Sequence, residues 1–212
     1  MEKVVERNPV IEKKSVNNIM IALYAFVVIS FFITIVDIII RFPLQSEMID
    51  YNDIQAIVIN VLALLIQIFF FAYGFVNAIR GMLSPKRMGA VIVAFFAATC
   101  ITGTGNMVIN SNVQIVLWWI VLIIPNIVGA VATFAYFVSG KKSKIYSIII
   151  YLAAIWGIFR IIYSNYNLIV HANQYLSMNS TVRLVLGIAI HCLVIYQTYV
   201  LWIKRQNAID IS

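Results

Sequence analysis

The sequence has few charged residues for its length. Asp, Glu, Lys and Arg make up 11% of its 212 residues, whereas 63% of the residues are hydrophobic. A soluble domain carries about 25% charged residues, which cover its water-facing surface. A chain this poor in charge cannot cover such a surface, so we expect its solvent to be the lipid bilayer. No polar segment is long enough to form a separate soluble domain.

The sequence also lacks the motifs that mark catalytic, metal and cofactor sites. It contains no His-Glu-x-x-His, no Gly-x-Ser-x-Gly and no phosphate-binding glycine loop. His171 and His191 each stand alone, and Cys100 and Cys192 form no paired framework. We therefore expect no metal, no cofactor and no catalytic residue. An integral membrane enzyme is the weakest alternative for the function.

Six apolar segments account for most of the chain. Each is close to or above the roughly 20 residues that an α-helix needs to cross a bilayer, and none alternates like a barrel strand. The first starts too late and is too long for a cleavable signal peptide. The sequence thus predicts an all-α, polytopic integral membrane bundle of six transmembrane helices. The segments are Asn18–Arg41, Ile54–Ile79, Arg87–Thr104, Val113–Val138, Ile145–Tyr163 and Val182–Ile203.

The basic residues predict the topology of these segments. Twelve of the 15 Lys and Arg lie in the N-terminal tail, in the second and fourth connections, or after the last segment. Cytoplasmic regions hold such an excess, so both chain ends are predicted to be cytoplasmic. We expect the protein to lie in the plasma membrane. Residues 1–17 then form a basic tail, 18–203 the membrane domain and 204–212 a short C-terminus. The net charge of +7 comes from basic residues beside the apolar segments, where they determine topology, so we expect no binding to nucleic acid.

Polar residues inside the segments fall on single helical faces. Ser30, Thr34 and Asp37 share one face, and Gly187 and His191 share another, because their spacings match the helical repeat. Polar groups are costly in lipid and usually face the bundle interior or a water-filled cavity. The candidate ligand-binding residues on these faces are Asp37, Asn60, Asn126, Arg160, Arg183 and His191.

Two interpretations of these residues remain open. In the first they are structural: arginines near helix ends snorkel to the interface, Asp37 pairs with one of them, and small or amide side chains pack between helices. In the second, Asp37, Arg160 and Arg183 lie at similar depth in the outer leaflet, with His191 two turns below Arg183. One Asp against two Arg leaves positive charge there, which suits a small anionic or zwitterionic ligand.

Two main hypotheses for the function follow. The first is a small-solute-binding or transporting membrane protein with an outward-facing polar site, working with a partner subunit or as a homo-oligomer. Six helices with both chain ends in the cytoplasm, in a chain of 212 residues, are similar to the layout of the substrate-binding components of energy-coupling-factor transporters. The first segment carries Ala22 and Ala25 in place of the alanine spacing of that family. The alternative is a non-catalytic membrane interaction protein, such as an accessory, immunity or scaffold subunit.

The depth of Asp37 can be tested against that of Arg41, which lies one turn closer to the membrane edge on the same face. We expect Asp37→Ala to lower the melting temperature in detergent more than Arg41→Ala, because a deeper polar group depends more on protein partners. Thermal unfolding of both variants beside the unaltered protein measures the difference. Equal melting temperatures would contradict the assigned depth.

Overall fold

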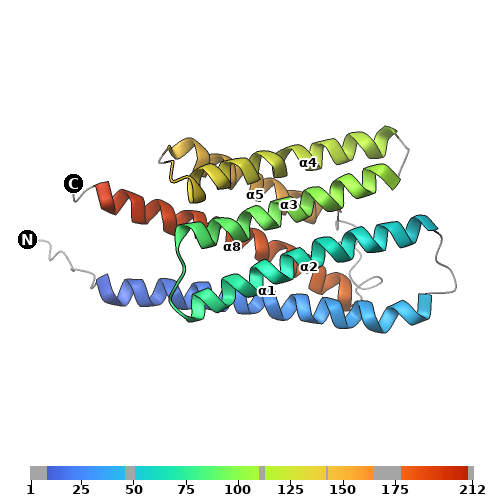
Figure 1. The fold of residues 1–212 in the computed structure, drawn as a ribbon, viewed down its shortest axis with the longest axis horizontal. Coiled ribbons are helices and arrows are strands. Elements are labelled where there is room, and N and C mark those ends of the chain that lie inside the picture. Colours follow the sequence, from blue (N-terminus) through green and yellow to red (C-terminus); the bar gives the residue numbers. More distant parts are fainter. Residues whose placement is uncertain (1–8, 46–50, 110–112, 142, 165–177, 210–212) are drawn as a thin grey trace, which may run out of the picture.

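The computed structural model describes residues 9–45, 51–109, 113–141, 143–164 and 178–209. These residues form six α-helices and no strand, and about 93% of the structure is helical (Figure 1). The predicted all-α helical bundle is confirmed. The helices are α1 (Pro9–Gln45), α2 (Tyr51–Ile79), α3 (Pro85–Ile109), α4 (Val113–Thr133), α5 (Lys144–Ser164) and α8 (Met178–Ile209), and a π-helical turn (Phe134–Val138) follows α4.

Five helices of the described part are long and apolar enough to cross a membrane. Helices suit this environment because they satisfy all their backbone hydrogen bonds internally. The chain is therefore an integral, multi-pass membrane protein. The α4 region contributes a shorter described apolar stretch, Ile123–Val138, so a sixth span stays a prediction. The five spans are Asn18–Val36, Val58–Ile79, Pro85–Thr104, Lys144–Tyr163 and Leu184–Lys204.

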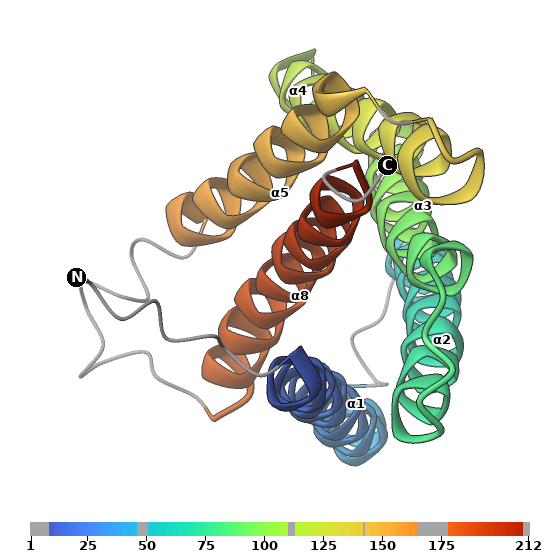
Figure 2. The ribbon, with the colours of Figure 1, turned by 90° about the vertical axis from the view of Figure 1, so that its left-hand side faces the viewer.

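The helices pack in chain order, with one exception at the end of the chain. From α1 to α5 each helix packs against the next. The chain then returns through α8, which packs between α5 and α1 and also touches α3 (Figure 2). As a result α1 begins and α8 ends at the same end of the bundle (Figure 1). This position makes α8 the helix that closes the bundle.

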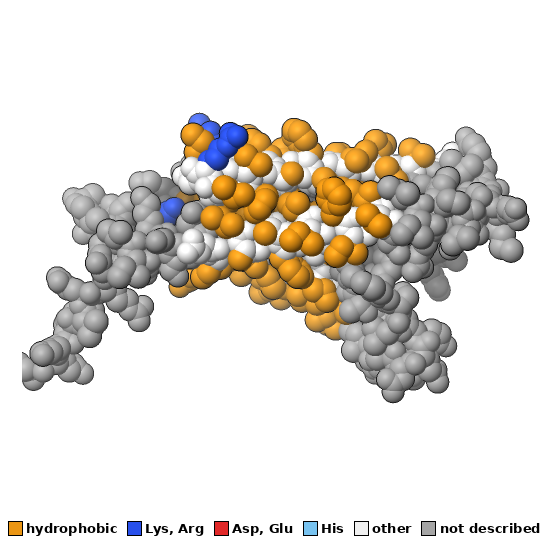
Figure 3. Space-filling model, turned by 90° about the horizontal axis from the view of Figure 1, so that it is seen from below, with side chains coloured by type: hydrophobic (Ala, Val, Ile, Leu, Met, Phe, Trp, Pro, Cys, Tyr) orange, Lys and Arg blue, Asp and Glu red, His pale blue; other side chains and the backbone are white. Residues whose placement is uncertain are grey.

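Basic side chains gather at the end of the bundle where α1 begins and α8 ends. Figure 3 shows Lys and Arg atoms at this end, which we call the basic end. The turns there use Gly81 and Gly140, whose positive φ angles of 66° and 70° suit glycine. Of the described basic side chains, only Arg160 lies near the opposite end. The others are Arg80, Lys86, Arg87, Lys141, Lys144 and Lys204.

The surface between the two ends is apolar. Phe32 and Phe69 are each 68% exposed and Leu152 is 61% exposed. Figure 3 shows hydrophobic side chains covering this middle region on the face in view. Monomeric soluble proteins rarely expose a continuous apolar surface larger than a few hundred Å². Lipid contact explains why so many large apolar side chains point outward here.

Two helices differ from the segments predicted by hydropathy. α1 begins at Pro9, nine residues before Asn18, and ends at Gln45, past the apolar segment. Proline is favourable in a first helical turn, and polar turns can continue a helix beyond the bilayer. α4 runs through Pro125 and passes into the π-helical turn, where the N–H of Ser139 donates to the carbonyl of Phe134 at 2.9 Å. Such a turn places one extra residue in the hydrogen-bonded ring.

Glycines allow the helices to approach closely. At five positions a neighbouring helix or turn places a side chain directly against the glycine backbone, where a Cβ atom would collide with it. Membrane helices use small residues in this way, because close approach supplies the van der Waals contacts that hold them together. The pairs are Gly74 with Tyr24, Gly89 with Phe137, Gly129 with Phe96, Gly157 with His191, and Gly187 with Ile161.

Gly74 tests the importance of this packing for stability. A Cβ atom there would lie 2.7 Å from the Cζ atom of Tyr24, which is fully buried. We expect Gly74→Ala to lower the free energy of unfolding by about 1–3 kcal/mol through overpacking. The control is Ala22→Val, which adds bulk at an exposed position of α1. Unfolding both variants in mixed detergent measures the difference, and an equal effect of the two would contradict the packing.

Candidate functional site

His191 lies at the centre of the contact between α5 and α8. Its side chain is 4% exposed, and its imidazole packs against Gly157 of α5 and edge-on to Phe95 of α3, with 4.9 Å between ring centroids. Nδ1 lies 2.7 Å from the carbonyl oxygen of Gly187. A carbonyl only accepts, so Nδ1–H is the donor and Nε2 is left as the acceptor of the neutral ring. Three helices thus fix the position of this side chain.

Arg160 places a positive charge beside this contact. It lies three residues after Gly157 on α5 and is half-buried. In the described part of the chain α5 packs against α4, the π-helical turn and α8. None of these elements contains an Asp or Glu, and the sequence has no acidic residue from 54 to 209. The packed neighbours of α5 therefore supply no carboxylate for this guanidinium.

Asn126 adds an amide from α4. It is 9% exposed and lies three residues before Gly129, which packs against Ala153 of α5. α4 and α8 both pack on α5 and do not contact each other in the described residues, so Asn126, Arg160 and His191 lie on three successive helices of the bundle. We call these three residues the polar group. The guanidinium and the amide can donate hydrogen bonds to an anion, whereas Nε2 of His191 faces Gly157.

The remaining predicted ligand residues are not part of the polar group as described. Asn60 is exposed on α2, and in the described residues α2 packs against α1 and α3 only. The side chains of Asp37 and Arg183 lie outside the described residues. Among the described residues no three His, Cys, Asp or Glu side chains lie together, so we derive no metal chemistry from this region.

Several Ser and Thr hydroxyls donate hydrogen bonds within their own helices. Each donates to the backbone carbonyl four residues earlier, at distances from 2.7 to 3.0 Å. Such bonds satisfy a Ser or Thr hydroxyl without any partner on another helix. These hydroxyls are therefore satisfied without a solute. They belong to Ser30, Thr34, Thr99, Thr133 and Thr198.

Sequence reasoning missed a second buried polar contact. Tyr24 of α1 and Gln197 of α8 are both fully buried, and the Nε2 of Gln197 donates to the hydroxyl of Tyr24. The Oε1 of Gln197 has no hydrogen-bond partner. Helical spacing from His191 leads to Thr198, seven residues later, and Gln197 lies off that face. A glutamine in an apolar run was the available signal, because a buried amide in lipid needs a partner.

Comparisons of the chain with protein-family models, curated proteins and solved structures found no match. No relative therefore supplies a ligand, a reaction or a partner. The function has to be argued from the polar group, from the buried contacts that hold it and from the distribution of charge.

The contact between Tyr24 and Gln197 can be tested by a double-mutant cycle. We expect Gln197→Leu and Tyr24→Phe each to lower the free energy of unfolding by about 1–3 kcal/mol, because each leaves a buried polar group unpaired. The double variant should lose less than the sum of the two, since it removes both polar groups together. Unfolding in mixed detergent measures all three variants. Strictly additive losses would show that the two side chains do not interact.

Proposed function

We propose that the protein binds and transports a small anionic or zwitterionic solute through a site at the end of the bundle opposite the basic end. The observation that supports this most is Arg160, a half-buried arginine inside an apolar span. No carboxylate on the helices packed against α5 neutralises it. A solute that carries a carboxylate or a phosphate would do so.

The chemistry of the polar group suits such a solute. A guanidinium stays charged even when it is desolvated, and its planar fork binds carboxylate or phosphate through two parallel hydrogen bonds. The amide of Asn126 can donate or accept a hydrogen bond. Two further residues are candidates from the sequence. Asp37 would bind the ammonium of a zwitterion, and Arg183 would bind a second anionic group.

The proposed orientation follows from the charges. The basic end would face the cytoplasm, because cytoplasmic regions of membrane proteins hold the excess of Lys and Arg. The chain would then cross the membrane six times, and the polar group would face outward. The most natural location is the plasma membrane. A single bundle of this size would act with a partner subunit or as a homo-oligomer.

The alternative is a non-catalytic membrane interaction protein. It is favoured by the close packing of His191 against Gly157 and Phe95, because this packing explains the buried ring without a solute. In that case Arg160 extends to the membrane edge and binds no solute, as long basic side chains near helix ends can do.

A thermal-shift screen separates the two functions. We expect a small carboxylate, phosphate or amino acid to raise the melting temperature of the purified protein. At about 100 times its dissociation constant such a ligand adds about 2.7 kcal/mol of stability. Arg160→Ala and Arg183→Ala should abolish the shift, because both remove positive charge at the proposed site.

The matched control is Arg80→Ala, which removes an exposed arginine at the basic end. It should keep the full shift. If no compound stabilises the protein, and both site variants fold normally, the solute-binding proposal is wrong and the interaction protein is favoured.

A further inference from the structure

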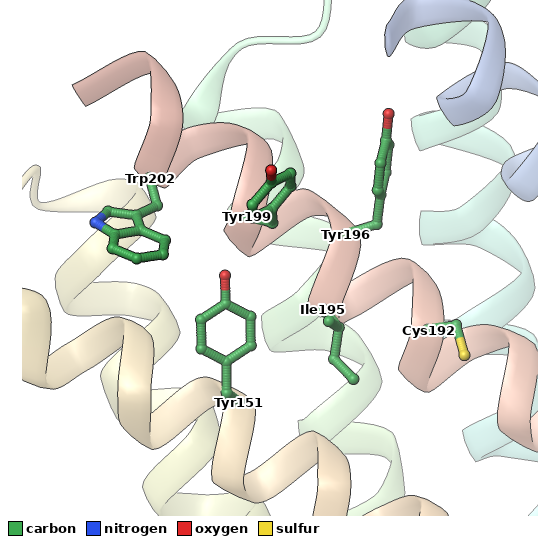
Figure 4. A pocket seen from close by; sticks show the side chains of 6 residues that line it. All are labelled: Tyr151, Cys192, Ile195, Tyr196, Tyr199 and Trp202. Atoms are coloured by element: carbon green, nitrogen blue, oxygen red, sulfur yellow. The ribbon is translucent and has the colours of Figure 1, made fainter. Parts of the chain in front are cut away.

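A groove runs along the membrane-facing surface between α5 and α8. Its volume is about 470 Å³, within the range of roughly 300–1,000 Å³ that ligand pockets occupy. In Figure 4 the Tyr151 side chain rises from α5 towards the space between Tyr199 and Trp202 of α8. The groove is lined by Tyr151, Cys192, Ile195, Tyr196, Tyr199 and Trp202.

We propose that this groove holds one acyl chain of an anionic phospholipid, with the phosphate of its headgroup bound by Lys144. This inference does not rest on the proposed solute site, because the groove faces the bilayer and lies towards the basic end.

The position of the groove favours a lipid as its occupant. Tyr199 is 47% exposed and Cys192 is also exposed, on the side of α8 away from its buried residues. In a multi-pass membrane protein such a surface meets acyl chains. Tyr and Trp are enriched at membrane interfaces, where the ring lies among chains and the polar atom reaches the headgroups. Tyr151 and Tyr199 provide this combination, whereas Trp202 contributes only its ring, because its Nε1 is buried.

Charge complementarity favours an anionic headgroup. Lys144 is exposed, opens α5 at the basic end and precedes Tyr151 by seven residues, so the two share one helical face. A phosphate at Lys144 would therefore lie on the line of the groove. Neither α5 nor α8 contains an acidic residue that would repel it. Basic clusters next to transmembrane helices attract anionic lipids in the same way.

Native mass spectrometry of the detergent-purified full chain tests the site. Phosphatidylglycerol and phosphatidylcholine with the same acyl chains are added separately, and the bound fraction is measured. We expect a single tight adduct with phosphatidylglycerol and weaker binding of phosphatidylcholine. Lys144→Gln should weaken the phosphatidylglycerol adduct by about five-fold, the effect of one basic residue at an anionic surface. Tyr199→Ala should weaken it as well, because the groove loses one wall.

The matched control is Lys86→Gln, which removes an exposed lysine at the same end of the bundle on α3. It should leave the adduct unchanged. Equal binding of the two lipids, or equal losses in Lys86→Gln and Lys144→Gln, would overturn the proposal. Lys144 is exposed, so its replacement leaves the packing intact even if Tyr199→Ala fails to fold.

Discussion

Close contact between α8 and its neighbours is the constraint on which the rest of the structure depends. Water supplies no hydrophobic drive between helices inside a bilayer, so their association relies on tight packing and a few buried hydrogen bonds. Gly157 makes room for the ring of His191, and Gly187 does the same for Ile161. On the other side of α8, Gln197 bonds to Tyr24 of α1. These contacts join the last helix to both edges of the row formed by α1 to α5, and they set which residues of α5 face inward.

The same packing determines where the charge of Arg160 lies. Once Gly157 is turned towards α8, the residue three positions later lies beside the buried face of α5, near the end of its span. The helices packed there carry no acidic group. The other described basic side chains lie at the basic end, where water and lipid headgroups solvate them. Arg160 lies in the apolar span, away from the basic end and without a carboxylate on the helices packed against it, which is why a solute anion is the partner that we propose for it.

Much of the architecture was predictable from the sequence, because long apolar runs and the distribution of lysine and arginine act locally. The helices of all six segments, and the gathering of Lys86 and Lys204 at one end, follow from those patterns. The neighbours of each helix do not, since they depend on three-dimensional packing. Helical spacing put Asn126, Arg160 and His191 on polar faces, and only the structure places their helices side by side. The pairing of Gln197 with Tyr24 could not be predicted, because the two residues lie 173 positions apart in the sequence.

The most direct test of the central claim is the access of water to residue 160. In a background with Cys100 and Cys192 replaced by alanine, Arg160→Cys and Phe159→Cys are treated with a membrane-impermeant, negatively charged thiosulfonate. The reagent is added to the side opposite the chain ends. The two positions lie at nearly the same depth, but Phe159 is 56% exposed on the lipid-facing surface. A water-filled site predicts much faster modification at residue 160. Equal rates, or faster modification at residue 159, would contradict the site and leave Arg160 as a membrane-edge anchor.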